Sequence, residues 1–156
     1  MKKLLALVTV FAVFAIAPAT ASAGDDRVRA RVTADGGQEA TPVDTEMTGR
    51  FRVEVEDGEI EFRLRVEDNS GTIVAAHIHC AAPGVNGPVG LNLGVEPFTS
   101  EEGEVVRSTV TSLGDNGCGW TSADDVAAAI EMGAAYVNIH TLANRGGEIR
   151  GNLTAR

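Results

Sequence analysis

The stretch GRFRVEVEDGEIEFRLRV, residues 49–66, alternates apolar and charged side chains on both sides of an Asp-Gly pair. Such alternation is typical of half-buried strands, because successive side chains of a strand point to opposite faces. Asp57-Gly58 between the two runs predicts a β-hairpin with a two-residue turn. That register places Arg52 opposite Arg63, so either diagonal neighbours of opposite charge carry the pairing or the turn is longer.

The same period-two pattern recurs on both sides of this hairpin, interrupted by turns rich in Gly, Pro and Asn. A single helical signal follows Ser122, an N-cap residue with Asp125 as its capping-box partner, and predicts a helix over residues 126–132 that ends at Gly133. Many short strands with closely spaced turns predict an all-β antiparallel Greek-key sandwich or barrel with one short helix. We expect the further strands over residues 27–34, 72–79, 89–95, 104–110, 135–141 and 148–154.

The chain begins with two lysines, an apolar stretch and a small-residue run, MKKLLALVTVFAVFAIAPATASA. This pattern predicts a Sec-type signal peptide over residues 1–23, cleaved after Ala23. Residues 24–156 would then form one domain that is secreted or periplasmic. Because the apolar stretch is too short for a comfortable membrane span, we expect no membrane insertion.

The net charge of the chain indicates which classes of partner are to be expected. The formal net charge is −9, and it becomes more negative when Lys2 and Lys3 leave with the leader. A surface of this sign repels nucleic acid and anionic membranes, so we expect neither as a partner. It is compatible with a cation, with a basic partner, or with a charge that only keeps the protein soluble.

Cys80 and Cys118 are the only cysteines of the chain. An even count in an oxidising compartment predicts a disulfide between them. The competing interpretation makes Cys80 a metal ligand together with His77 and His79. Strand geometry disfavours it, because Cys80 is out of phase with His79.

The three histidines fall on the polar faces of predicted strands. His77 and His79 share one face, with Cα atoms roughly 6.6 Å apart, and His140 lies in the predicted strand 135–141. If those two strands are neighbours, three imidazoles converge into a site suited to zinc or copper(II). Otherwise they are structural histidines that hydrogen-bond to nearby backbone. Glu148 is a weaker candidate, as a fourth ligand or as an acceptor for an imidazole N–H, unless it pairs with Arg150.

No signature of an activated serine or of a phosphate-binding glycine loop is present in the sequence. No carboxylate pair is marked out for acid–base catalysis. The residues therefore favour a non-catalytic binding module over an enzyme.

Three ordered motifs resemble the CHRD domain, named after chordin and found in many exported bacterial proteins. They are HIHCAAPGVNGPVGLNL (77–93), AYVNIHT (135–141) and GGEIRGNL (146–153). The most characteristic run is Gly147, Glu148, Ile149, Arg150 and Gly151. The resemblance spans about residues 26–156 and implies an immunoglobulin-like or superoxide-dismutase-like barrel. Animal members of the family point to an extracellular protein as partner.

Two functions remain open at this point. The first is a binding module for a protein partner or a single metal ion, copper or zinc. The second is a copper-dependent, superoxide-dismutase-like enzyme that uses His77, His79 and His140. The dismutase pattern also needs a zinc subsite with further histidines, and the sequence has none to supply it.

Overall fold

The structure is a computed structural model that describes residues 27–156. The predicted signal peptide and its cleavage site lie outside the described residues. Within this range no helix is both long and apolar enough to cross a membrane. The elements are β1 (Val28–Asp35), η1 (Gly36–Gln38), β2 (Thr48–Glu56), β3 (Glu59–Glu67), β4 (Ile73–Cys80), β5 (Val89–Asn92), β6 (Gly103–Val110), α1 (Ala123–Glu131), β7 (Ala135–Thr141) and β8 (Ile149–Leu153).

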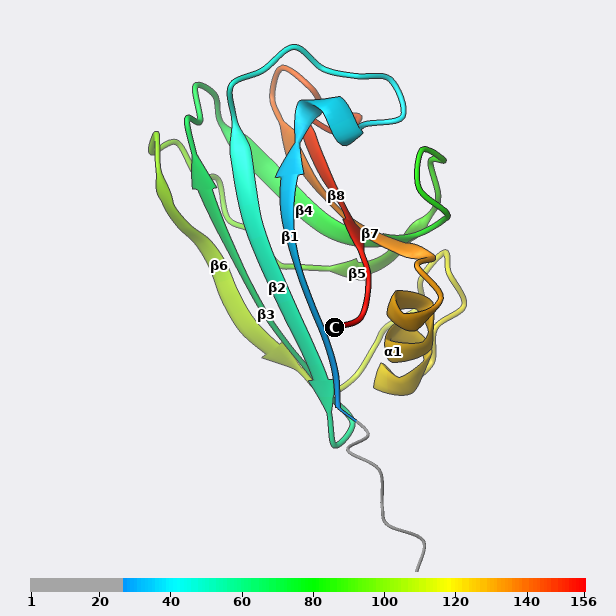
Figure 1. The fold of residues 1–156 in the computed structure, drawn as a ribbon. Coiled ribbons are helices and arrows are strands. Elements are labelled where there is room, and N and C mark those ends of the chain that lie inside the picture. The colour runs from blue at the N-terminus through cyan, green and yellow to red at the C-terminus, as the bar shows by residue number, and fades with distance from the viewer. Residues whose placement is uncertain (1–26) are drawn as a thin grey trace, which may run out of the picture.

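The eight strands form one antiparallel sheet in the order β5-β4-β7-β8-β1-β2-β3-β6. Figure 1 shows the sheet curled into a half-barrel, with β1, β2, β3 and β6 in front of β4 and β5. The predicted all-β class is therefore confirmed. Three neighbouring pairs, β4-β7, β8-β1 and β3-β6, join strands that are not consecutive in sequence.

The concave side of the sheet holds the hydrophobic core. The inward residues of the first hairpin are almost fully buried, as the alternation predicts, and the helix α1 adds Val126 and Ile130. Burying one large apolar side chain stabilises the fold by about 1.5–3 kcal/mol. The core positions of the hairpin are Phe51, Val53, Val55, Ile60, Phe62, Leu64 and Val66.

The hairpin of β2 and β3 has the two-residue turn that the Asp-Gly pair predicts, with φ of +50° at Asp57 and +78° at Gly58. Arg52 does lie opposite Arg63. Diagonal contacts offset part of the repulsion: Arg50 pairs with Glu67 at 3.1 Å although Arg65 is its direct neighbour. The turn is therefore not longer than two residues, but among the described residues no diagonal ion pair across this hairpin is formed by Arg52 or Arg63; Arg63 pairs instead with Glu104 of β6.

The capping box of α1 forms as predicted. The Ser122 hydroxyl accepts a hydrogen bond from the backbone N–H of Asp125, and the Asp125 carboxylate accepts one from the N–H of Ser122. The helix therefore begins at Ala123, directly after its cap, rather than at residue 126. The strand expected over 89–95 ends early at Asn92, whose side-chain carbonyl accepts the N–H of Gly94 and turns the chain.

Cys80 and Cys118 form a disulfide, with an S–S distance of 2.02 Å and a Cα–Cα distance of 5.9 Å. The predicted pairing is thus confirmed. The bond joins the end of β4, immediately after His79, to the loop that precedes α1.

Candidate metal centre

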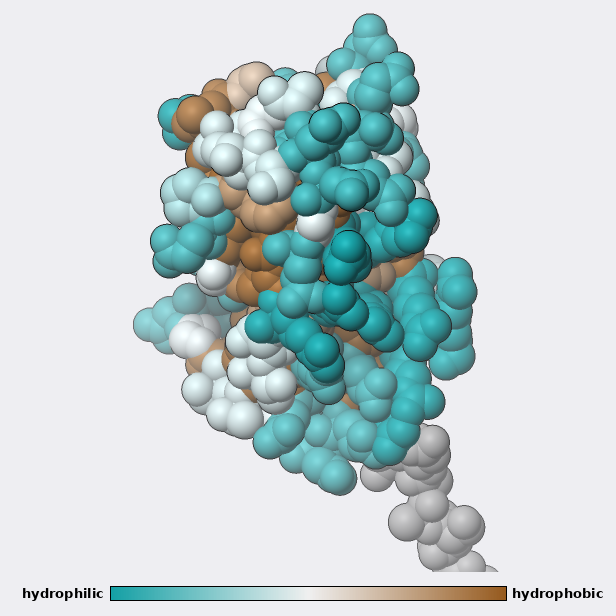
Figure 2. All heavy atoms as spheres, turned by 90° about the vertical axis from the view of Figure 1, so that its left-hand side faces the viewer, coloured by the Kyte–Doolittle hydropathy of each residue, from teal (hydrophilic) through white to brown (hydrophobic). Residues whose placement is uncertain are grey.

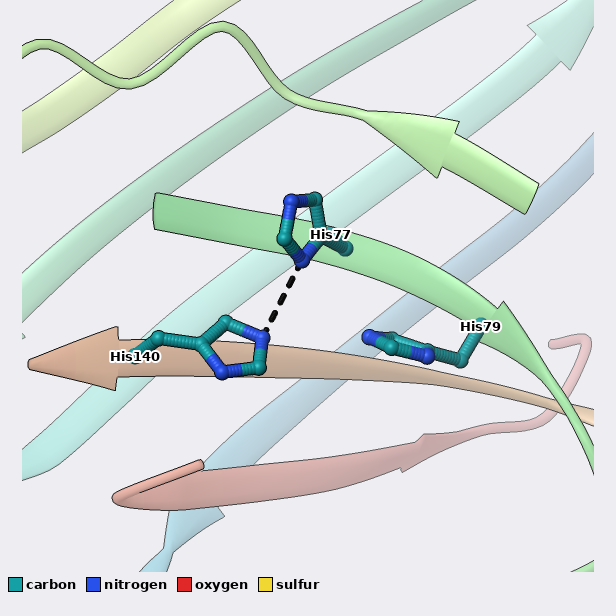
Figure 3. A group of neighbouring side chains, drawn as sticks. All are labelled: His77, His79 and His140. Carbon is teal, nitrogen blue, oxygen red and sulfur yellow. Dashed lines mark hydrogen bonds between the residues drawn. The ribbon is translucent and has the colours of Figure 1, made fainter. Parts of the chain in front are cut away.

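The three histidines converge on the convex side of the sheet. One ring nitrogen from each of His77, His79 and His140 lies within 4.8 Å of the other two. The closest pair is Nδ1 of His77 and Nε2 of His140, 3.1 Å apart (Figure 3). Two nitrogens at about 2.1 Å from one tetrahedral ion would be about 3.4 Å apart. To surround a single ion, the 3.1 Å pair would move apart slightly, and the other separations, which are at most 4.8 Å, would shorten.

Strand pairing creates this cluster. β4 and β7 are antiparallel neighbours, with Ala75 opposite His140 and His79 opposite Tyr136. Side chains at alternate positions share a face, so His77 and His79 project on the same side as His140. His77 is the diagonal neighbour of His140 across the pair, which explains their short contact.

Backbone carbonyls fix the tautomer of two rings. Nδ1 of His79 lies 2.9 Å from the carbonyl oxygen of Gly87, and Nδ1 of His140 lies 3.0 Å from that of Arg145. A carbonyl only accepts, so both Nδ1 atoms carry the proton and both Nε2 atoms present a lone pair. This is the arrangement in which a carbonyl holds a metal-binding imidazole in place.

The Nε2 atom of His79 is the least satisfied polar atom of the cluster. It is buried and has no hydrogen-bond partner among the described residues. Leaving a buried acceptor unpaired costs about 1–3 kcal/mol. A metal ion at the centre of the cluster would supply the missing partner.

The three imidazoles are neutral at neutral pH. Burial is the main cause that lowers the pKa of each ring, and the neighbouring histidines lower it further for His77, to about 4. Metal ions bind the neutral imidazole, so no proton has to be removed from a charged ring before an ion can bind.

Tyr136 and Arg150 form one wall of the cluster. The rings of His79 and Tyr136 are stacked, with centroids 4.9 Å apart and an angle of 10° between the planes. The guanidinium carbon of Arg150 lies 3.4 Å from the centroid of the Tyr136 ring. Because β7 lies between β4 and β8, the tyrosine contacts one of these side chains from each neighbouring strand.

Arg150 is completely buried and ties down the loop between β4 and β5. Its guanidinium group donates to the carbonyl oxygens of Val85 at 2.9 Å and Ala82 at 3.2 Å. The same loop contains Gly87, whose N–H donates to the Tyr136 hydroxyl and whose carbonyl orients His79. Arg150 thereby supports the orientation of His79 towards the other two histidines through the loop, and not through a hydrogen bond to its ring nitrogens.

A second buried polar pair lies beside the cluster on the same face. The Asn138 amide donates to the Glu39 carboxylate at 2.7 Å, and burial raises the pKa of Glu39. A Cβ on Gly147 would approach the side-chain oxygens of Asn138 and Glu39 to 2.5 and 2.6 Å, so this position has no room for a side chain.

Glu148 is not a member of the group formed by the three ring nitrogens. Its carboxylate accepts hydrogen bonds from the side chains of Thr45, Thr141 and Asn144. These bonds hold the turn between β7 and β8, which carries the carbonyl of Arg145 that orients His140. Glu148 also makes no ion pair with Arg150 among the described residues.

The residues that surround the three histidines are less evident from the sequence than the histidines themselves. Tyr136 and Asn138 share the polar face of β7 with His140, and this parity is the signal that connects them to the site. Glu39 and Gly87 lie in loops, where no periodicity indicates which side chains or carbonyls turn towards the sheet.

Comparison with known proteins gives one match. The CHRD domain family matches residues 30–153, from the middle of β1 to the end of β8. No curated protein and no solved structure matches the chain significantly. The matched range includes the three histidines, the disulfide and the buried Arg150. The chain therefore belongs to the CHRD domain family.

Proposed function

We propose that this protein is an exported, non-catalytic binding module whose histidine triad, His77, His79 and His140, binds a single zinc or copper(II) ion. The unpaired, buried Nε2 atom of His79 is the observation that carries the proposal. An atom in that environment is costly in a structural site and useful in a metal site.

The chemistry of the donor set favours a transition metal over calcium or magnesium. The triad offers three neutral nitrogens, and calcium and magnesium prefer oxygen ligands. Because His77 is half-buried, we expect a bound ion to keep a fourth position accessible to water or to a side chain of a partner. A bound ion would therefore give an extracellular protein partner a defined point of attachment.

Ion binding requires one local change. In the absence of an ion, Nε2 of His140 has a lone pair and accepts a hydrogen bond from Nδ1 of His77. Coordination through this nitrogen of His77 moves its proton to Nε2. The net charge of the ring is the same before and after this change, because both of its tautomers are neutral.

Copper redox chemistry of the dismutase type is the second candidate, and the open coordination position favours it. The full chain has three histidines, all of them in the triad. A copper site alone can therefore be built, but not the additional zinc subsite of the copper–zinc dismutases. Because the chain lacks the zinc subsite of the copper–zinc dismutases, we favour metal binding without catalysis over dismutase activity.

Isothermal titration of the leaderless protein, purified without a histidine tag, tests the proposal with ZnCl₂ and CuCl₂ as probes. We expect one ion per chain, and a loss of binding of about tenfold or more in His79→Ala and His140→Ala. Ser108→Ala, an exposed change on β6 at the opposite edge of the sheet, serves as control and should bind normally. Failure of both ions to bind at one per chain, or unchanged binding by His79→Ala, would sink the metal site.

The copper-loaded protein then separates the two candidates. If the protein is a binding module, superoxide decays no faster with the copper-loaded wild type than with His79→Ala at the same copper concentration. A wild-type rate far above that background would replace the binding module with an enzyme.

A further inference from the structure

A row of four arginines crosses the convex face of β1, β2, β3 and β6, away from the histidine triad. Arg31 lies opposite Arg52, Arg52 opposite Arg63, and Arg63 opposite Arg107. Neighbouring strands are about 4.8 Å apart, so this arginine row is about 14 Å long. We define the row by these four residues.

Direct opposition of like charges destabilises a sheet. Two members of the row have acidic neighbours: Arg63 pairs with Glu104, and Arg107 approaches Glu61 at 3.5 Å. Arg31 and Arg52 form no ion pair within residues 27–156. The pair at the β1–β2 end of the row therefore has no direct ion pair, although the Glu54 carboxylate is close enough to interact electrostatically with Arg31.

A shallow hollow lies over this part of the sheet. It has a volume of 340 Å³, and Arg50 and Arg65 line it together with three members of the row. Arg65 also lacks an ion pair among the described residues, and Arg50 uses Glu67. Figure 2 shows the hydrophilic surface over the outer side of the β6 and β3 edge. Positive charge is thus concentrated here, although the whole chain has a net charge of −9.

We propose that the arginine row binds a linear acidic polysaccharide through its carboxylate or sulfate groups. Guanidinium groups form paired hydrogen bonds with both kinds of anion. A row of such groups at the spacing of β-strands fits an extended chain with regularly repeated anions. The repulsion that destabilises the free sheet is relieved when the ligand binds.

Nucleic acid and anionic lipid fit this face less well. Single-stranded nucleic acid is held by exposed aromatic side chains as well as by charge. The aromatic residues of the strands beneath this face, Phe51 and Phe62, are buried in the core. Duplex DNA and anionic membranes present broad charged surfaces that would also meet the acidic remainder of the protein, whereas a single extended polysaccharide chain has to contact only the arginine row.

The test is fluorescence anisotropy with labelled polygalacturonate, which carries carboxylates, and labelled dextran sulfate, which carries sulfates. We expect wild-type protein to bind at least one of them at low salt and more weakly at about 150 mM salt. Arg52→Gln should weaken that binding about fivefold. Arg145→Gln is the matched control, because it removes the same charge from an exposed site outside the row.

Thermal unfolding shows whether Arg52→Gln weakens binding directly or only by destabilising the fold. Arg52→Gln removes a like-charge contact, so its melting temperature should equal or exceed that of the wild type while binding falls. The proposal is overturned if neither polysaccharide binds, if Arg52→Gln and Arg145→Gln have equal effects, or if duplex DNA or phosphatidylglycerol vesicles bind more tightly than both polysaccharides.

Discussion

Replacing Arg150 by methionine should destabilise the protein and weaken metal binding at the same time. Methionine fills much of the volume but donates no hydrogen bond. The carbonyl oxygen of Val85 loses its donor, that of Ala82 keeps only the N–H of Val85, and the contact with the Tyr136 ring is lost as well.

The expected loss is about 3 kcal/mol, from two charge-assisted hydrogen bonds and one cation–π contact, less the favourable burial of the methionine. For a domain of this size, that loss lowers the melting temperature by about 10 °C. Release of the loop that holds the Gly87 carbonyl frees the ring of His79. We therefore expect zinc or copper affinity to fall about tenfold or more.

Urea unfolding measures the first effect, and isothermal titration under folded conditions measures the second. Arg145→Met is the matched control, because Arg145 is exposed and its structural contact uses only its backbone carbonyl. A loss below about 1 kcal/mol for Arg150→Met would refute the role of the buried guanidinium group in stability. Unchanged metal affinity despite the expected loss of stability would refute its link to His79.

Three further predictions follow from buried or constrained groups. Burial lowers the folded pKa of His77 to about 4, below the unfolded value, so its contribution is complete above about pH 6.5 and is lost as the pH falls towards 4. After allowance for the partial exposure of His77, the free energy of unfolding of the metal-free wild type should fall by about 1–2 kcal/mol more than that of His77→Gln between about pH 6.5 and pH 4, as measured by urea unfolding. Parallel pH dependences of the two proteins would contradict this. Reduction of Cys80–Cys118, which are separated by 38 residues, should cost about 4 kcal/mol in calorimetry, and an unchanged melting temperature would show that the bond does not stabilise the fold. Gly147→Ala should cost roughly 2 kcal/mol in urea unfolding, because φ is +129° and the new Cβ meets Asn138; wild-type stability would exclude that crowding.

The candidate metal centre and the disulfide share one loop. The disulfide fixes the chain directly after His79, and Arg150 fixes the following residues up to Val85. Gly87 then approaches the end of β4 so closely that a Cβ would lie 2.0 Å from the carbonyl oxygen of Cys80. The disulfide, the buried guanidinium group of Arg150 and the close approach of Gly87 thus act together to place the Gly87 carbonyl oxygen beside the ring of His79.

The sequence alone determined the features that depend on neighbouring residues. Alternation and the Asp-Gly pair determine the register of the β2–β3 hairpin, because a two-residue turn fixes which residues are opposite. The capping box determines where α1 begins, since both of its hydrogen bonds join residues three apart. The parity of His77 and His79 follows from the geometry of a single strand.

Only the tertiary structure decided what these local features do together. Whether His140 meets His77 depends on β7 pairing with β4, and the arginine row depends on β1 and β6 flanking the hairpin. Such pairings join segments far apart in the chain, so they are selected by the packing of the common core and not by any local pattern. The loop carbonyls that orient the imidazoles belong to the same class, because they are placed by the disulfide and by Arg150 from β8.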